Sequence, residues 1–319
     1  MILLFSALLQ FDIMSLLYSA RQISVWFLVA LLGLQVVTQL LINIQWHQIA
    51  KFANTRISFW DMIYLNSKGA VVDSITPGVK IGGEITRTLQ IKRILCCSVG
   101  QAAALVAVQK TFSLGVFFFI SLFAAAYLTV RGSFVQFYHL QILVYGVMVA
   151  FVALFFSIII MPHRIIEYLQ PKEITRFRWA GKLKVFLLSL LEQVCFIRKS
   201  SKAWVIPLSL SVLIWLLYPA KIYILATQIS PGVNVIYLGA IAFVAYMAAI
   251  LPVFPGGLGG FEGTMSAMLF AVGFNLTDAV VITVLFRFVT FWFVMILSII
   301  FIAFYKFKYA KGDLLSAKG

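Results

Sequence analysis

Apolar residues occur along this chain in long blocks that few charged residues interrupt. Several blocks exceed the ~18 residues that indicate a membrane-spanning helix. Lipid offers the backbone no hydrogen-bond partners, and the alternation typical of barrel strands is absent, so the blocks predict helices. The blocks are Val25–Ile44, Phe112–Val130, Ile142–Met161, Val205–Ala226, Val233–Leu251 and Val280–Phe304.

Shorter apolar segments complete the expected path of the chain through the membrane. Met1–Leu17 is expected to form a first, rather short, spanning helix, and Phe59–Ile75 and Pro77–Arg93 to cross outward and back. Pro252–Gly273 begins with prolines and glycines, which predicts a broken passage of loop plus half-helix. The expected fold class is therefore all-α, with about eight spanning helices and two broken or re-entrant half-helix segments.

The composition supports a membrane protein. Of 319 residues, 63% are hydrophobic and only 11% are charged. Soluble domains carry about 45–50% apolar and roughly 25% charged residues, so a water-soluble fold is excluded. We expect a single integral membrane domain over residues 1–319, in the plasma membrane.

The net charge of +15 is concentrated in two places. Lys and Arg are abundant in the loop 162–202 and again after the last apolar block, and this bias predicts that both regions are cytoplasmic. Part of the loop, Ile174–Leu188, fits an amphipathic segment that binds anionic lipids. No nucleic-acid-binding module is recognisable, so nucleic acid is not expected as a partner.

Cysteine and histidine point to no cofactor. The three cysteines fit neither a disulfide framework nor zinc spacing, and the three histidines are scattered, so neither a metal site nor a cofactor is expected. These residues are Cys96, Cys97, Cys195, His47, His139 and His163.

One short motif occurs twice. Pro77 to Glu84 and Pro255 to Glu262 both follow the pattern P-G-x-x-x-G-x-E, 178 positions apart. A cation follows each copy within an apolar stretch, Lys110 after the first and Arg287 after the second. On the expected path the first copy runs inward and the second outward. This predicts an inverted repeat over about 24–130 and 203–308, with a binding site at the paired broken helices.

The charged residues of the two copies have two interpretations. They are structural ion pairs, or Arg87, Lys110 and Arg287 offer positive charge to a lipid phosphate, helped by backbone amides of the glycine segments. The two glutamates suit a cationic head group, a coupling proton or gating pairs. The candidate site residues are Glu84, Arg87, Lys110, Glu262, Arg287, Pro77, Gly82, Gly83, Pro255, Gly256, Gly257, Gly259 and Gly260.

Three other charged residues lie in or next to apolar segments. Lys68, between Ser67 and Gly69, is expected to be a further buried cation. Lys221 and Asp278 lie near the ends of apolar blocks, which places them at the membrane interface by expectation.

At these residues the chain resembles the flippase-like family named after the transmembrane region of lysylphosphatidylglycerol synthase. The first family motif corresponds to Pro77-x4-Gly82-Gly83-Glu84-x2-Arg87, and the second to Pro255 through Glu262, with the later arginine at Arg287. The resemblance extends roughly from Leu16 to Phe307. Lys110 departs from the family's usual arginine, which removes a bidentate phosphate contact there. Few residues follow Lys308, so we expect no aminoacyl-transferase domain and no synthesis of lysyl-lipid.

The resemblance implies translocation of a lipid between leaflets. The expected partner is an anionic or aminoacylated phospholipid, or an isoprenoid-linked lipid. The alternative is an integral-membrane transferase, or an accessory subunit of an envelope-biosynthesis enzyme, in which Glu84 and Glu262 act as general bases. No histidine-centred site or nucleotide motif supports an enzyme, so a transporter is the preferred hypothesis.

Overall fold

The computed structural model describes residues 24–76, 81–130, 138–171, 178–198, 201–230, 232–250 and 257–316. Within these ranges the chain forms helices joined by turns and no strand, in agreement with the all-α prediction. The expected first span at Met1–Leu17 lies outside the described residues, as do the motif residues Pro77, Pro255 and Gly256.

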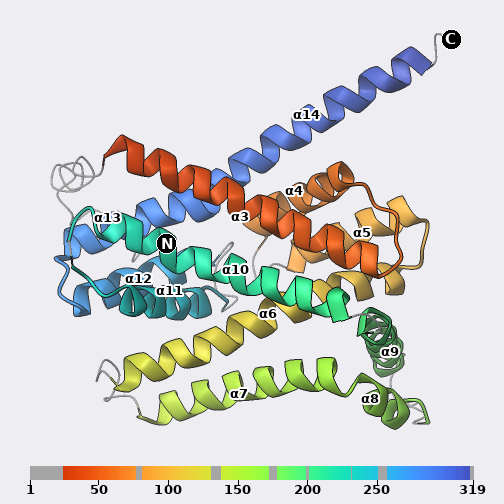
Figure 1. Cartoon of the computed structure of the whole chain (residues 1–319), viewed down its shortest axis with the longest axis horizontal. Coiled ribbons are helices and arrows are strands. Elements are labelled where there is room, and N and C mark those ends of the chain that lie inside the picture. The colour runs from red at the N-terminus through yellow and green to blue at the C-terminus, as the bar shows by residue number, and fades with distance from the viewer. Residues whose placement is uncertain are drawn as a thin grey trace.

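The helices of the described residues are labelled as in Figure 1. They are α3 (Val25–Phe52), α4 (Phe59–Ile75), α5 (Ile81–Leu95), α6 (Val99–Val130), α7 (Tyr138–Ile160), α8 (Pro162–Leu169), α9 (Arg178–Arg198), α10 (Ser201–Ala226), α11 (Val235–Ile250), α12 (Gly260–Ala271), α13 (Leu276–Arg287), the π-helical turn η3 (Phe288–Trp292) and α14 (Phe293–Ser316).

Four helical segments in the described part of the chain are long and apolar enough to cross a membrane. They are Val25–Phe52, Val99–Val130, Lys202–Ala226 and Leu276–Lys308, the last combining α13, η3 and α14. Tyr145–Ile160 of α7 and α8 meet the same criterion only as a pair, bent by 91°, and make a fifth span if the pair is counted as one. The chain is therefore a multi-pass membrane protein, and the expected number of about eight spans is not confirmed.

Part of the difference arises from short helices, because α4 and α11 were expected to span, whereas α5 and α12 lie in the segments expected to be broken or re-entrant. The segments α4, α5, α11 and α12 have 17, 15, 16 and 12 residues. A helix needs about 20 residues to cross the hydrocarbon core of a bilayer. Of these four, only α11 is apolar along its length, and each has fewer residues than a typical crossing.

Side-chain caps fix where two helices begin. The Ser58 hydroxyl accepts the Asp61 N–H at the start of α4, and the Asn275 side chain accepts the Asp278 N–H at the start of α13, at 3.1 and 2.8 Å. Such caps contribute about 1 kcal/mol each. Asp278 therefore lies in the first turn of α13, next to a chain turn, as expected for a residue near a helix end.

The helices pack as two similar sets (Figure 1). In the first set α4 packs against α5 and α5 against α6, and in the second α11 packs against α12 and α12 against α13. Each set also contacts the other in an equivalent way, because α4 packs against α14 while α11 packs against α6. Between the sets, α3 and α10 lie side by side across the middle of the molecule.

Polar side chains line the contact between α3 and α10. The Gln45 amide donates to the Ser211 hydroxyl at 2.5 Å and to the carbonyl of Pro207 at 2.8 Å, and it accepts from Gln109 of α6 at 3.0 Å. Gln35, ten positions earlier on α3, bonds to Lys221, ten positions later on α10. The two helices therefore run antiparallel, and hydrogen bonds join them both at Gln45 and at Gln35.

Lys221 is buried in this contact, so its expected interfacial position is wrong. Its side chain is fully buried. Its ammonium donates to Gln35 Oε1 at 2.5 Å and to Thr38 Oγ1 at 2.8 Å, and it lies 4.5 Å from the centre of the Tyr218 ring. No carboxylate among the described side chains lies within ion-pair distance of it. Neutral oxygens and an aromatic face therefore compensate the cost of burying this lysine.

Replacing Lys221 tests the importance of this contact. Lys221→Met leaves the buried Gln35 amide oxygen without its donor, so we expect a loss of about 1–3 kcal/mol of stability. The double variant Lys221→Met/Gln35→Leu removes both partners and should recover most of that loss. Thermal unfolding of the detergent-solubilised protein measures both, with Lys51→Met on an exposed position of α3 as the control. Equal unfolding temperatures for Lys221→Met and wild type would contradict this role.

Candidate functional site

The first motif copy lies in a helical hairpin made by α4 and α5. The Gly83 N–H donates to Asp73 Oδ1 at 2.9 Å, and Lys68 contacts Gln90 further from the turn. Residues earlier in α4 thus contact residues later in α5, so the two helices are antiparallel. Glycine makes this close approach possible, because a Cβ at Gly83 would lie 2.2 Å from the Asp73 carboxylate.

Four charged side chains meet beside the turn of this hairpin. Arg87 Nη1 lies 3.1 Å from Asp73 Oδ2 and 3.0 Å from Glu84 Oε1. The same Glu84 oxygen lies 2.6 Å from Lys110 Nζ, which comes from α6. We call Asp73, Glu84, Arg87 and Lys110 the first charge cluster. Its two carboxylates and two cations give no net charge.

Burial differs within the first charge cluster. The side chains of Arg87 and Asp73 are each 10% exposed, whereas Glu84 is 22% and Lys110 is 31% exposed. Glu84 and Lys110 are thus the members most accessible to a ligand or to water. Arg87 is held more firmly, because Gly69 leaves space for its guanidinium where a Cβ would come within 2.5 Å of Cζ.

The second motif copy lies in an equivalent hairpin of α11 and α12. Ala249 faces Gly257, and a Cβ at Gly257 would lie 2.8 Å from the Ala249 carbonyl oxygen. Tyr246, one turn earlier on α11, packs against Phe261 on α12 at a ring separation of 4.8 Å. Gly257 and Gly259 have positive φ angles of 69° and 85°, which side-chain-bearing residues rarely adopt. These glycines allow the chain to leave the turn and enter α12 directly.

Glu262 and Arg287 form the second charge cluster. Arg287 Nε lies 3.0 Å from Glu262 Oε1, and the two side chains are 7% and 15% exposed. The other carboxylate oxygen of Glu262 accepts the backbone N–H of Gly259 at 2.6 Å. Glu262 therefore caps the start of α12 and pairs with α13 at the same time, and a carboxylate is favourable at a helix N-terminus.

Aromatic rings enclose the Arg287 guanidinium. Its Cζ atom lies 5.0 Å from the centre of the Phe261 ring and 4.4 Å from that of Phe291. Phe261 in turn stacks on Phe286 with ring planes 6° apart. These rings limit access to water and add cation–π attraction, so the Glu262–Arg287 pair lies in a less polar environment than the first cluster.

In the structure, the glutamate of each motif copy contacts the cation that follows that copy in the sequence. Glu84 contacts Lys110, and Glu262 contacts Arg287, across corresponding elements of the two sets. Every predicted cation of the two clusters faces a carboxylate in this conformation, so neither cluster is a net positive pocket. Lys68 is only half-buried, and its ammonium lies 4.3 Å from the centre of the Tyr64 ring.

Asp73 was missed by the sequence reasoning. It pairs with Arg87 and accepts the N–H of Gly83, so it joins both arms of the first hairpin. The rule that marked the other residues, an ionisable group within an apolar stretch, also applies to Val71-Val72-Asp73. No group of three or more His, Cys, Asp or Glu side chains in the described ranges is arranged to hold a metal ion.

A glycine substitution tests the close approach in the first hairpin. Gly83→Ala places a methyl group against the Asp73 carboxylate, and we expect it to destabilise the protein by about 1–3 kcal/mol. Gly33→Ala in α3 is the matched control, since no atom lies within 4 Å of its added Cβ. Thermal unfolding in detergent compares them. A lower unfolding temperature for Gly33→Ala than for Gly83→Ala would contradict the packing described.

Comparison with known proteins identifies the family. The model of the lysylphosphatidylglycerol synthase TM region matches residues 1–298. A UPF0104 membrane protein of Methanocaldococcus jannaschii is 22% identical over 268 residues, which cover 81% of this chain and 78% of that protein. A UPF0104 membrane protein of Methanothermobacter thermautotrophicus is 22% identical over 253 residues, covering 74% and 73%. The chain therefore belongs to the lysylphosphatidylglycerol synthase TM region family.

Proposed function

We propose that this protein is a flippase-like transporter that moves a polar-headed or isoprenoid-linked lipid between the two leaflets of the plasma membrane. The observation that carries the proposal is the pair of charge clusters, each at the turn of a helical hairpin within an apolar helical bundle. Ionisable groups in such surroundings are costly and usually mark a transport pathway or a partner.

The two hairpins are proposed to enter the membrane from opposite sides. Their helices are shorter than one crossing, so each hairpin returns to the side from which it came. The antiparallel α3–α10 pair and the reciprocal packing of α4 on α14 and α11 on α6 support an inverted relation between the two sets. Such repeats place broken helices and their binding site near the middle of the bilayer.

The orientation follows from the basic residues. The α3–α4 and α5–α6 connections, α8, α9 and the end of α14 all lie toward the right in Figure 1. Exposed Lys and Arg occur in or beside these connections, at Lys51, Arg56, Lys92 and Arg93. We therefore assign this end and the C-terminus to the cytoplasm, in line with the enrichment of Lys and Arg in cytoplasmic loops.

The charge clusters give the transporter a way to respond to a lipid head group. Separating Glu84 from Lys110, or Glu262 from Arg287, leaves an uncompensated charge, which costs about 3–5 kcal/mol when the site is buried. A head group that offers its own phosphate to the cation, or its own ammonium to the carboxylate, offsets this cost. The ligand then favours the open arrangement by its differential affinity for it.

A leaflet-exposure assay in liposomes tests this function. Fluorescent anionic, zwitterionic, aminoacylated and isoprenoid-linked lipids are each compared for wild type and for Glu262→Gln. The glutamine keeps an oxygen for the Gly259 N–H but removes the charge that faces Arg287. We expect one lipid class to be moved, and its rate to fall about tenfold or more, since each 1.4 kcal/mol corresponds to a factor of ten.

Two further variants make the assay specific. Arg287→Ala should lose movement like Glu262→Gln, whereas Glu192→Gln on the exposed side of α9 should keep the wild-type rate. Transport that persists in both cluster variants would reduce the pair to a structural role. No movement of any lipid class by correctly folded protein would reject the flippase proposal in favour of a transferase or accessory subunit.

A further inference from the structure

A second feature of the molecule lies away from both charge clusters, on the contact between α4 and α14. Two aromatic pairs join the helices: Trp60 stacks on Phe301 with centroids 6.1 Å apart, and Tyr64 stacks on Tyr305 at 4.1 Å. Trp60 and Tyr64 are four positions apart and so occupy the same face of α4. Aromatic rings therefore line this contact at the proposed cytoplasmic end of both helices.

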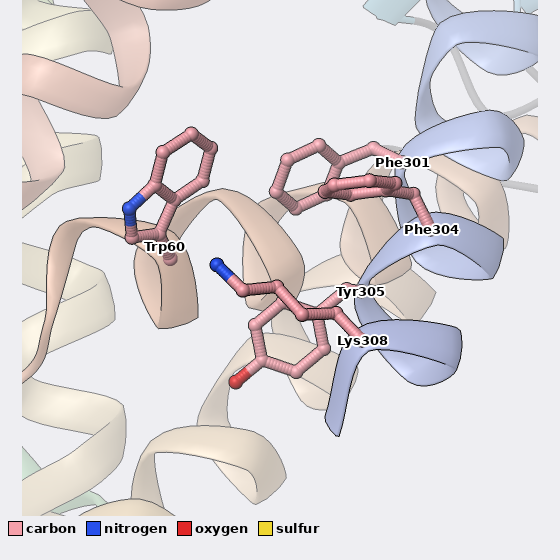
Figure 2. Close-up of a pocket in the computed structure, with 5 residues that line it drawn as sticks. All are labelled: Trp60, Phe301, Phe304, Tyr305 and Lys308. Carbon is pink, nitrogen blue, oxygen red and sulfur yellow. The ribbon is translucent and has the colours of Figure 1, made fainter. Parts of the chain in front are cut away.

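The rings border a cavity of about 180 Å³ that opens to the surface. Figure 2 shows Trp60 on one side and Phe301, Phe304 and Tyr305 on the other, with the Lys308 side chain extending between them. Trp60 and Phe304 are 52% and 57% exposed, so the cavity is accessible from the surroundings of the protein. Its walls are almost entirely apolar, and Lys308 is the charged residue among those that line it.

The charge of Lys308 is not compensated by a carboxylate in the described part of the chain. Its Nζ atom lies 5.8 Å from the centre of the Trp60 ring. The neighbouring acid, Asp61, accepts the Ser58 hydroxyl at 2.7 Å and the Tyr305 hydroxyl. Asp61 is therefore engaged by two hydroxyl groups, and it holds Tyr305 with its ring toward the cavity. The cavity combines an apolar wall with one available positive charge.

We propose that this cavity binds an anionic phospholipid, with the head-group phosphate at the Lys308 ammonium and the start of an acyl chain against Phe301 and Phe304. The chemistry fits each part of the ligand: an ammonium attracts phosphate, and tryptophan and tyrosine favour the level of the head groups. A lipid here contacts α4, which carries Asp73, and α14 together. Its binding stabilises the position of the first hairpin against the long C-terminal helix.

Native mass spectrometry of the full chain in detergent tests the site directly. The protein is titrated with phosphatidylglycerol and, separately, with phosphatidylcholine of the same acyl chains. Near a membrane surface one Lys contributes about 1 kcal/mol to binding of anionic lipid, which corresponds to a factor of about five. We expect Lys308→Gln to weaken phosphatidylglycerol binding about fivefold and to leave phosphatidylcholine binding unchanged.

Matched variants separate this site from general attraction to a basic surface. Lys306→Gln is the control, because Lys306 is exposed on α14 but does not line the cavity. It should keep the wild-type affinity, and Lys308→Arg should retain most of it by keeping the charge. Equal losses in Lys306→Gln and Lys308→Gln would overturn the assignment. An unchanged affinity in Lys308→Gln, with the wild-type unfolding temperature, would also overturn it.

A third arm distinguishes a lipid from a free phosphate. Inorganic phosphate is added in millimolar excess before phosphatidylglycerol. We expect it to displace little lipid, since it lacks the acyl chain that contacts Phe301 and Phe304. Complete displacement by phosphate, or Lys308-dependent phosphate binding without lipid, would overturn the lipid assignment. The outcome does not depend on flippase activity, so it can succeed or fail independently of the proposed transport.

Discussion

Carboxylates at the turns of the two hairpins are the constraint on which the rest of the structure depends. Asp73 joins Arg87 to the backbone of Gly83, and Glu262 joins Arg287 to the backbone of Gly259. Each carboxylate thus satisfies a helix N-terminus and a cation together. In an apolar environment an unpaired group of either kind is expensive, so loss of one carboxylate affects both the hairpin and its neighbour.

The helices around the hairpins are arranged so that this compensation is possible. Lys110 and Arg287 come from the long apolar segments that follow the hairpins, and each reaches back to a glutamate near a hairpin turn. The α3–α10 contact uses a different solution, since Lys221 is stabilised by Gln35, Thr38 and an aromatic ring. In the described part of the bundle, charges are paired in the hairpins, and the buried Lys221 is held by neutral oxygens in the α3–α10 contact.

Much of this arrangement follows from local pattern. The repeated P-G-x-x-x-G-x-E motif and the later cations singled out Glu84 with Lys110, and Glu262 with Arg287, as either ion pairs or ligand-binding groups, because their spacing matches in two copies. Apolar composition predicted helices throughout. Hydropathy measures composition over a window, however, so it does not separate a short helix that returns from one that crosses. For this reason hydropathy counts α4 and α11 as spans, although their 17 and 16 residues are fewer than a typical crossing.

The burial of Lys221 was not predictable from its own segment. Its position near the end of an apolar block suggested the interface, but its surroundings depend on Gln35 and Thr38, some 180 positions earlier. Asp73 could have been found as the other charges were, as an ionisable group within an apolar stretch. Its two partners, Arg87 and the Gly83 N–H, become evident only when α4 and α5 pack as a hairpin. Pairings between distant elements set these environments, and such pairings leave weak signals in a single sequence.

The most direct test of the account is the sidedness of the hairpin turns in sealed membrane vesicles of both orientations. Single cysteines at Asn54, Asn275, Ile81 and Leu258, in a protein whose native cysteines are replaced by serine, are labelled with a membrane-impermeant maleimide. The account predicts that Asn54 and Asn275 label from opposite sides. It also predicts that Ile81 labels much more slowly than Asn275 from the side on which Asn275 is exposed. Likewise, Leu258 should label much more slowly than Asn54 from the side on which Asn54 is exposed. Rapid labelling of Ile81 from the Asn275 side would mean that α4 and α5 cross the membrane, and would contradict the paired re-entrant hairpins.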